Sequence, residues 1–230
     1  MHRPRRMTDQ LRPRGAVFFD LDGVLVDSLP AHLHFCERMA RELQVPVVIP
    51  SPLDFKNSIV RQGITISPMY FFFRALNFPE PEARIATQRY ENEFARVPTP
   101  FFPGVAEMLA SLARLNSLGI VTSNVRSVVR SSLREYLALF DESCIFAYDD
   151  PISRSKAEAL EAGVQQLHVR HADVLFIGDQ EADLEAARSV GVPFLGVSYG
   201  WGISAEDDGF DKVGSPDAIA KHVFQKRKGP

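Results

Sequence analysis

The chain has 230 residues, 45% of them hydrophobic, and a formal net charge of −3 at pH 7. This length and composition predict a globular protein with one large domain, or with a main domain and a smaller insertion. The weak negative charge argues against nucleic acid or an anionic membrane as a partner. No apolar run approaches the roughly 20 residues that a membrane span needs. Cys36 and Cys144 are far apart, which favours reduced, buried thiols and a cytoplasmic location.

Residues 1–14 form a basic segment with five arginines and two prolines. The pair Arg5-Arg6 is not followed by an apolar segment, so a twin-arginine export signal is excluded. We therefore expect a disordered basic tail at this end of the sequence.

The stretch from residue 29 to residue 97 is predicted to be helical. Residues 29–43 have apolar side chains at helical spacing, with Glu and Arg between them, as in an amphipathic helix. Further helical segments are expected over residues 54–62, 68–76 and 82–96. The aromatic run at residues 69–73 is expected to belong to the core of this unit, with a partner-binding surface as the alternative. A proline-rich stretch at residues 98–104 marks the end of the unit.

The rest of the chain alternates between strand and helix. Short apolar, β-prone runs predict strands over residues 16–19, 119–123, 144–148, 173–177, 193–197 and 212–213. Amphipathic helices are predicted over residues 105–116, 128–139, 156–167, 182–190 and from residue 216. This alternation predicts an α/β fold with a parallel sheet that helices cover on both faces. In such sheets, ligands bind at the carboxyl ends of the strands.

Reactive side chains recur just after these strands or at the start of the next helix, at Asp20, Asp22, Ser123, Asn124, Lys156, Asp179 and Asp183. Singly, each has a structural explanation: a solvated acidic turn, a helix cap, a solvated lysine or a carboxylate at a helix N-terminus. Together they suit a single anionic ligand. Several carboxylates require a cation, and hard oxygen ligands favour Mg²⁺. A hydroxyl, an amide and a lysine would bind phosphoryl oxygens.

Asp20 and Asp22 are two residues apart, so their side chains point to the same side of an extended segment. Gly23, which follows them, allows a ligand to approach the backbone closely. We interpret the stretch as a metal-supported phosphate site with Asp20 as the nucleophile. On these residues alone, a strand that ends in a solvated turn is an equal alternative.

The sequence resembles the haloacid dehalogenase superfamily of hydrolases, in the branch with a helical cap, and is similar to its phosphoglycolate-phosphatase-like members. Residues 20–28, 121–124 and 178–187 match the first, second and fourth motifs of that superfamily. The third motif is weaker, because Lys156 lacks the prolines that follow the lysine in many relatives, and Arg154 is a rival for its role.

The resemblance implies a Rossmann-like three-layer α/β/α core formed by residues 15–28 and 98–225, with an inserted helical cap at residues 29–97. It also implies that Asp20 forms an aspartyl-phosphate and that Asp22 is the acid and base. Mg²⁺ would be bound by Asp20, the backbone carbonyl of Asp22 and Asp179, with Asp183 supporting it indirectly. Phosphoryl oxygens would be bound by Ser123, Asn124 and Lys156. Dehalogenases of this superfamily lack the second aspartate, so Asp22 argues against carbon–halogen cleavage.

The cap is expected to select the substrate, with His32, Arg61 and Gln62 as candidate contacts. The predicted protein is a Mg²⁺-dependent phosphatase that acts on a small phosphorylated metabolite, as a monomer or homodimer. One alternative is a β-phosphoglucomutase-like isomerase, which a cap with Lys56 as its single lysine favours little. Another is a non-catalytic binding protein, against which the complete set of motif carboxylates argues.

Overall fold

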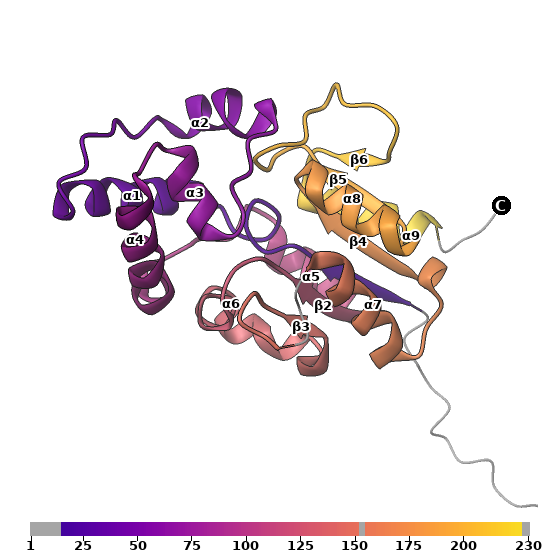
Figure 1. Cartoon of the computed structure of the whole chain (residues 1–230). Helices are drawn as coiled ribbons and strands as arrows, with labels where there is room; N and C mark the ends of the chain where they lie inside the picture. The colour runs from indigo at the N-terminus through magenta and orange to yellow at the C-terminus, as the bar shows by residue number, and fades with distance from the viewer. Residues whose placement is uncertain (1–14, 152–154, 227–230) are drawn as a thin grey trace, which may run out of the picture.

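The computed structural model describes residues 15–151 and 155–226, and its centre is a six-stranded parallel sheet (Figure 1). The strands lie in the order β3-β2-β1-β4-β5-β6. Their bounds are β1 (Ala16–Phe19), β2 (Ser117–Val121), β3 (Ile145–Phe146), β4 (Val174–Gly178), β5 (Phe194–Val197) and β6 (Lys212–Val213). The order reverses direction between β1 and β4, which is where doubly wound folds bind ligands. The predicted basic tail and Arg154 lie outside the described residues.

Helices cover both faces of this sheet. Those that flank it are α5 (Val105–Leu112), α6 (Arg126–Leu133), α7 (Lys156–Leu167), α8 (Glu181–Val190) and α9 (Pro216–Lys226). Successive side chains of a strand point to opposite faces. Phe18 of β1 therefore packs in one hydrophobic cluster with α7 and α8, whereas Phe19 belongs to another with α5, α6 and α9. The predicted three-layer α/β/α architecture is confirmed.

Between β1 and α5 the chain forms a group of helices at one side of the sheet (Figure 1). They are α1 (Leu29–Glu42), α2 (Pro52–Ser58), α3 (Met69–Ala75) and α4 (Glu80–Glu93). Phe72 and Phe73 of the aromatic run are buried, while Phe71 is 42% exposed. The hydrophobic cluster of these helices is continuous with that of one sheet face. The limits of a separate cap domain, residues 29–97, stay a prediction.

Short 3₁₀ turns account for most differences from the expected helices. They are η1 (Val60–Gln62), η2 (Phe94–Arg96), η3 (Arg134–Leu139), η4 (Glu142–Cys144) and η5 (His171–Asp173). The predicted helix over residues 128–139 was wrong in its second half, because Arg134 has a φ of 43° and ends α6. α2 begins before residue 54, because Ser51 Oγ accepts a hydrogen bond from the backbone N–H of Asp54. None of the helices in the described part of the chain has the length and hydropathy that crossing a bilayer requires.

The contact between α7 and β1 gives a test of this packing. Gly163 of α7 lies against the fully buried ring of Phe18, and an added Cβ would overlap ring carbons Cζ and Cε1. We expect Gly163→Ala to lower the free energy of unfolding by about 1–3 kcal/mol through overpacking, although alanine favours a helix interior by about 1 kcal/mol. Urea unfolding measures the change. Adding Phe18→Leu should recover part of the loss, and strictly additive losses in the double variant would contradict the steric explanation.

Candidate active site

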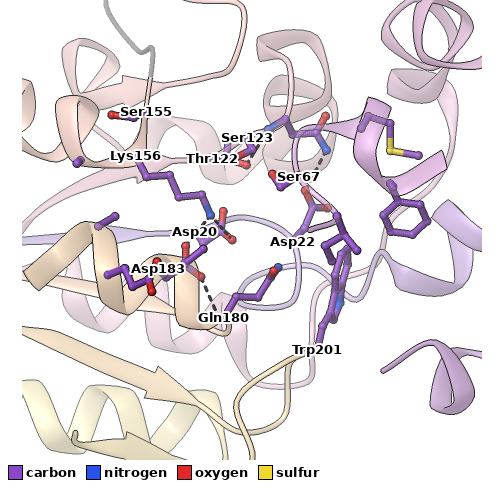
Figure 2. Close-up of a pocket in the computed structure, with 18 of the residues that line it drawn as sticks. Asp20, Asp22, Ser67, Thr122, Ser123, Ser155, Lys156, Gln180, Asp183 and Trp201 are labelled. Atoms are coloured by element: carbon purple, nitrogen blue, oxygen red, sulfur yellow. Dashed lines mark hydrogen bonds and ion pairs between the residues drawn. The ribbon is translucent and has the colours of Figure 1, made fainter. Parts of the chain in front are cut away.

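A cavity of about 440 Å³ lies at the carboxyl ends of β1 and β2, between the sheet and helices α3 and α4 (Figure 2). The predicted site residues that line it are Asp20, Asp22, His32, Ser123, Asn124, Lys156 and Asp183. Asp179 is fully buried beside Asp20 and Asp183. Segments that are far apart in the sequence therefore meet at one edge of the sheet, as the strand-end pattern predicted.

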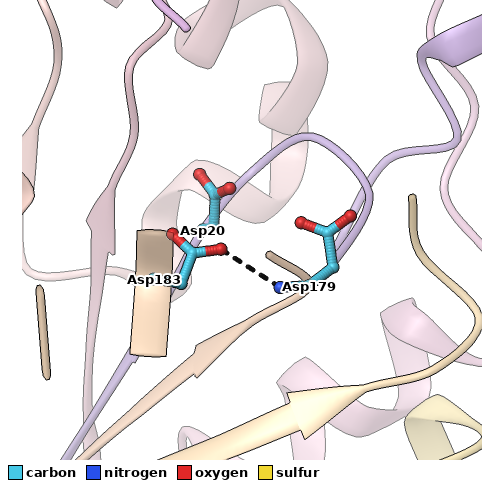
Figure 3. Close-up of side chains that lie close together, drawn as sticks. All are labelled: Asp20, Asp179 and Asp183. Carbon is cyan, nitrogen blue, oxygen red and sulfur yellow. Dashed lines mark hydrogen bonds between the residues drawn. The ribbon is translucent and has the colours of Figure 1, made fainter. Parts of the chain in front are cut away.

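Asp20, Asp179 and Asp183 form a cluster in which one carboxylate oxygen from each lies within 4.8 Å of the others (Figure 3). Asp183 Oδ2 accepts hydrogen bonds from the backbone N–H groups of Asp179 (3.2 Å) and Gln180 (3.1 Å). The bond from Gln180 belongs to a capping box that begins α8. Asp183 thus fixes the backbone that carries Asp179, which suits an indirect role at a metal site.

Asp179 is enclosed by backbone on two sides. Its Oδ2 accepts a hydrogen bond of 2.6 Å from the backbone N–H of Trp201. Gly23, with a φ of +79°, and Gly200 both lie so close that a Cβ at either position would overlap the Asp179 side chain. Oδ1 of Asp179 is buried and has no hydrogen-bond partner among the described residues. An unpaired carboxylate oxygen inside a carboxylate cluster is the arrangement that a hard cation such as Mg²⁺ fits.

Lys156 provides the positive charge of the cluster. Its Nζ lies 2.9 Å from Asp20 Oδ2 and 2.6 Å from Asp183 Oδ1, and Asp20 Oδ1 accepts the backbone N–H of Leu21 at 2.8 Å. Burial raises the pKa of Asp20 more than Lys156 lowers it. Burial, together with Asp183 and Asp20, also raises the pKa of Asp179 well above its ordinary value. One lysine does not balance these carboxylates, and a divalent cation would.

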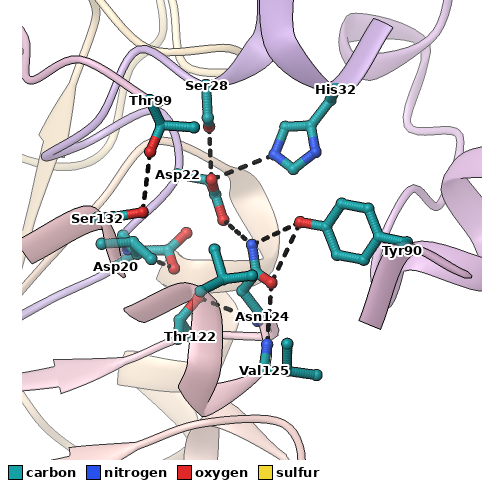
Figure 4. Close-up of polar contacts among 12 residues, drawn as sticks. Asp20, Asp22, Ser28, His32, Tyr90, Thr99, Thr122, Asn124, Val125 and Ser132 are labelled. Carbon is teal, nitrogen blue, oxygen red and sulfur yellow. Dashed lines mark hydrogen bonds and ion pairs between the residues drawn. The ribbon is translucent and has the colours of Figure 1, made fainter. Parts of the chain in front are cut away.

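Asp22 has a different environment, although it is only two residues from Asp20. Its carboxylate accepts hydrogen bonds from Ser28 Oγ (2.5 Å) and Asn124 Nδ2 (2.9 Å), and its Oδ1 lies 3.2 Å from His32 Nε2 (Figure 4). Burial alone would raise the pKa of Asp22, but the interactions with His32, Ser28 and Asn124 hold it below its ordinary value. The two aspartates are thereby prepared for different tasks.

Residues 17–197 match the haloacid dehalogenase-like hydrolase family. The chain belongs to this family. It is 29% identical over 220 residues to an N-acetylmuramic acid 6-phosphate phosphatase of Pseudomonas putida. The aligned region covers 93% of this chain and 94% of that relative. It is 33% identical over 190 residues to a phosphoglycolate phosphatase of Synechococcus elongatus, and the aligned region covers 81% of this chain and 84% of that relative. The resemblance seen in the motifs is confirmed.

The fold of this haloacid dehalogenase-like hydrolase is also found among solved structures. A family member from Streptococcus pneumoniae has a TM-score of 0.75 over 91% of this chain and 98% of its own, at 23% identity. Together with the phosphatase relatives, the family match identifies the chain as a phosphoric monoester hydrolase.

Asn124 and Ser123 differ in their freedom to bind a ligand. The Asn124 amide donates to Asp22 and to Tyr90 Oη (2.9 Å), and its Oδ1 accepts the backbone N–H of Val125 (2.9 Å). With these bonds, the Asn124 side chain orients Asp22 and connects it to Tyr90 of α4. Ser123 lines the cavity and is half-buried. A phosphoryl contact stays a prediction for both residues.

The three candidate specificity residues differ in burial and in their position relative to the cavity. His32 is buried, stacks on Phe94 with ring centroids 4.6 Å apart, and contacts Asp22. Arg61 and Gln62 are exposed, do not line the cavity, and hydrogen-bond to Asn57. Both residues lie in the short turn η1, and their side chains contact Asn57 of the preceding helix α2.

The sequence pattern missed several residues that shape the cavity wall, namely Ile66, Met69, Phe72, Tyr90 and Trp201. Tyr90 repeats at helical spacing with Ala83, Ala86 and Phe94, so it reads as an ordinary core residue. Trp201 lies between Gly200 and Gly202, and no sequence pattern shows that its ring lines the cavity.

Removing the buried ammonium group tests the charge balance. We expect Lys156→Met to lower the free energy of unfolding by about 3–5 kcal/mol in EDTA, because Asp20 and Asp183 would lose their buried partner. The control Lys221→Met breaks a solvent-exposed pair with Asp217 and should have little effect. Urea unfolding measures both variants, and equal losses would contradict the buried-charge explanation.

Proposed function

We propose that the chain hydrolyses the phosphate monoester of a small metabolite in two steps through Asp20. The supporting observation is the placement of Asp20 at the tip of β1, where it lines the cavity and pairs with Lys156 Nζ at 2.9 Å. Phosphoryl transfer depends mainly on positioning and on neutralised charge. A carboxylate held by a cation at the mouth of a cavity meets both needs.

In the first step, Asp20 attacks phosphorus, the bond from phosphorus to the ester oxygen breaks, and Asp22 gives a proton to the leaving oxygen. In the second step, water attacks the aspartyl-phosphate, Asp20 is released, and Asp22 takes the water's proton. The hydrogen bonds that Asp22 accepts from Ser28 and Asn124 favour the ionised form needed as the base. Lys156, with Ser123 beside the cavity, would hold the phosphoryl oxygens.

The residues present fit a Mg²⁺ ion. Asp20, Asp179 and the backbone carbonyl of Asp22 would hold it, with Asp183 orienting the backbone of Asp179. The bound ion would neutralise charge on the phosphoryl group. The buried, unpartnered Asp179 Oδ1 is the observation that supports this assignment.

The substrate is proposed to be a small phosphorylated metabolite. Two relatives act on compounds of this kind, N-acetylmuramic acid 6-phosphate and phosphoglycolate, as their names state. A monomeric or homodimeric state and a cytoplasmic location remain predictions.

The nucleophile is tested by Asp20→Asn, which keeps the shape of the side chain and removes its charge. Hydrolysis of phenyl phosphate with Mg²⁺ should fall by at least about a thousandfold, since the covalent route is lost. Asp217→Asn, an exposed change in α9, is the matched control and should retain activity. Circular dichroism checks that both variants fold. Appreciable turnover by a folded Asp20→Asn protein would refute the assignment.

The metal site is tested without reference to activity. Mg²⁺ at about 100 times its Kd should stabilise the folded protein by about 2.7 kcal/mol, seen as a rise in Tm. Asp179→Asn should abolish this rise, because it removes a charged ligand from the cluster. The Asp217→Asn control should respond as the unaltered chain does. An equal Mg²⁺ response in Asp179→Asn would count against the site.

A further inference from the structure

The half of the cavity that faces away from the carboxylate cluster is largely apolar. Its wall is formed by Ile66, Met69, Phe72, Tyr90 and Trp201. Figure 2 shows Trp201 across the cavity from Lys156. This wall is where the group esterified to the phosphate would lie, because Asp20 and Lys156 occupy the opposite end.

This half of the cavity offers no cation for a second anionic group. In the part of the chain that the structure describes, Lys156 is the one lysine or arginine that lines the cavity; it lies at the opposite end, and its Nζ already contacts Asp20 and Asp183. His32 Nε2 is held by Asp22. The remaining charged residues that line the cavity are acidic, namely Asp20, Asp22, Asp183 and Glu185. A carboxylate on the leaving group would therefore lose water without gaining a partner.

Trp201 closes this wall as a fixed aromatic surface. Its side chain lines the cavity with only 5% of the residue exposed. The residue is held in place, because its backbone N–H donates to Asp179 and its ring meets His32 edge-on at 5.5 Å.

We propose that this hydrolase selects phosphate monoesters whose leaving group is uncharged. The proposal rests on the proposed function and adds a class of substrate to it. It separates the chain from its phosphoglycolate phosphatase relatives, because phosphoglycolate carries a carboxylate one carbon from its ester oxygen.

A matched pair of ligands tests the charge preference. Phosphoglycolate and 2-hydroxyethyl phosphate have the same two-carbon frame and differ in a carboxylate against a hydroxymethyl group. Both compounds are tested as competitive inhibitors of phenyl phosphate hydrolysis in Mg²⁺. The KI of 2-hydroxyethyl phosphate, whose leaving group is uncharged, should be lower than that of phosphoglycolate by about tenfold or more. An equal or lower KI for phosphoglycolate overturns the proposal.

Failure of the proposed function would be seen separately. Without Mg²⁺-dependent hydrolysis of phenyl phosphate, the phosphatase mechanism fails. The ligand preference is still measurable then, because Trp201 is the single tryptophan of the chain and its fluorescence reports binding on this wall. Tighter binding of phosphoglycolate in that titration overturns the present inference as well.

Introducing a cation gives the converse test. Met69, half-buried at the start of α3, lines the cavity. Met69→Lys should shift the ratio of KI values toward phosphoglycolate by about tenfold or more, while Met69→Gln, similar in length and neutral, should not. A folded Met69→Lys protein with an unchanged ratio contradicts the charge explanation.

Discussion

The crowding of buried carboxylates around one lysine is the constraint on which the rest of this structure depends. Asp183 begins α8 with one oxygen and binds Lys156 with the other, so the helix start and the ion pair share one side chain. Asp20 ends the central strand, and Asp179 anchors the glycine-rich loop through Trp201. These elements are therefore held in place by carboxylates whose negative charge the one lysine does not balance. A cation bound by these side chains would therefore be linked to folding.

The site separates two carboxylates by environment rather than by distance in the sequence. Asp20 contacts an ammonium group and lies beside other carboxylates, whereas Asp22 accepts hydrogen bonds from Ser28 and Asn124 and lies against His32. Ser28 and His32 come from the start of α1, and Asn124 is tied to Tyr90 of α4. The helices inserted after β1 therefore contribute to the surroundings of Asp22, while the sheet and α7 determine those of Asp20.

The sequence predicted the layers and the strand-end cluster because both follow from local signals. Apolar runs mark strands, and carboxylates directly after them, as at Asp20 and Asp179, are costly unless they have a function. The cavity wall lacked such a signal, because Tyr90 and Met69 have the spacing of core residues. The left-handed φ of Arg134 was equally hidden, since any residue type in a helical pattern suggests that the helix continues. Arg61 is charged and lies near Gly63, but neither property determines which way its side chain points.

Gly23 and Gly200 press on the same carboxylate from opposite parts of the chain. A side chain at either position would displace Asp179. No substitution at the other glycine could make room, because that residue already has no side chain. The two positions are thus barred from compensating each other. In a lineage that keeps Asp179, both are therefore expected to persist as glycine independently.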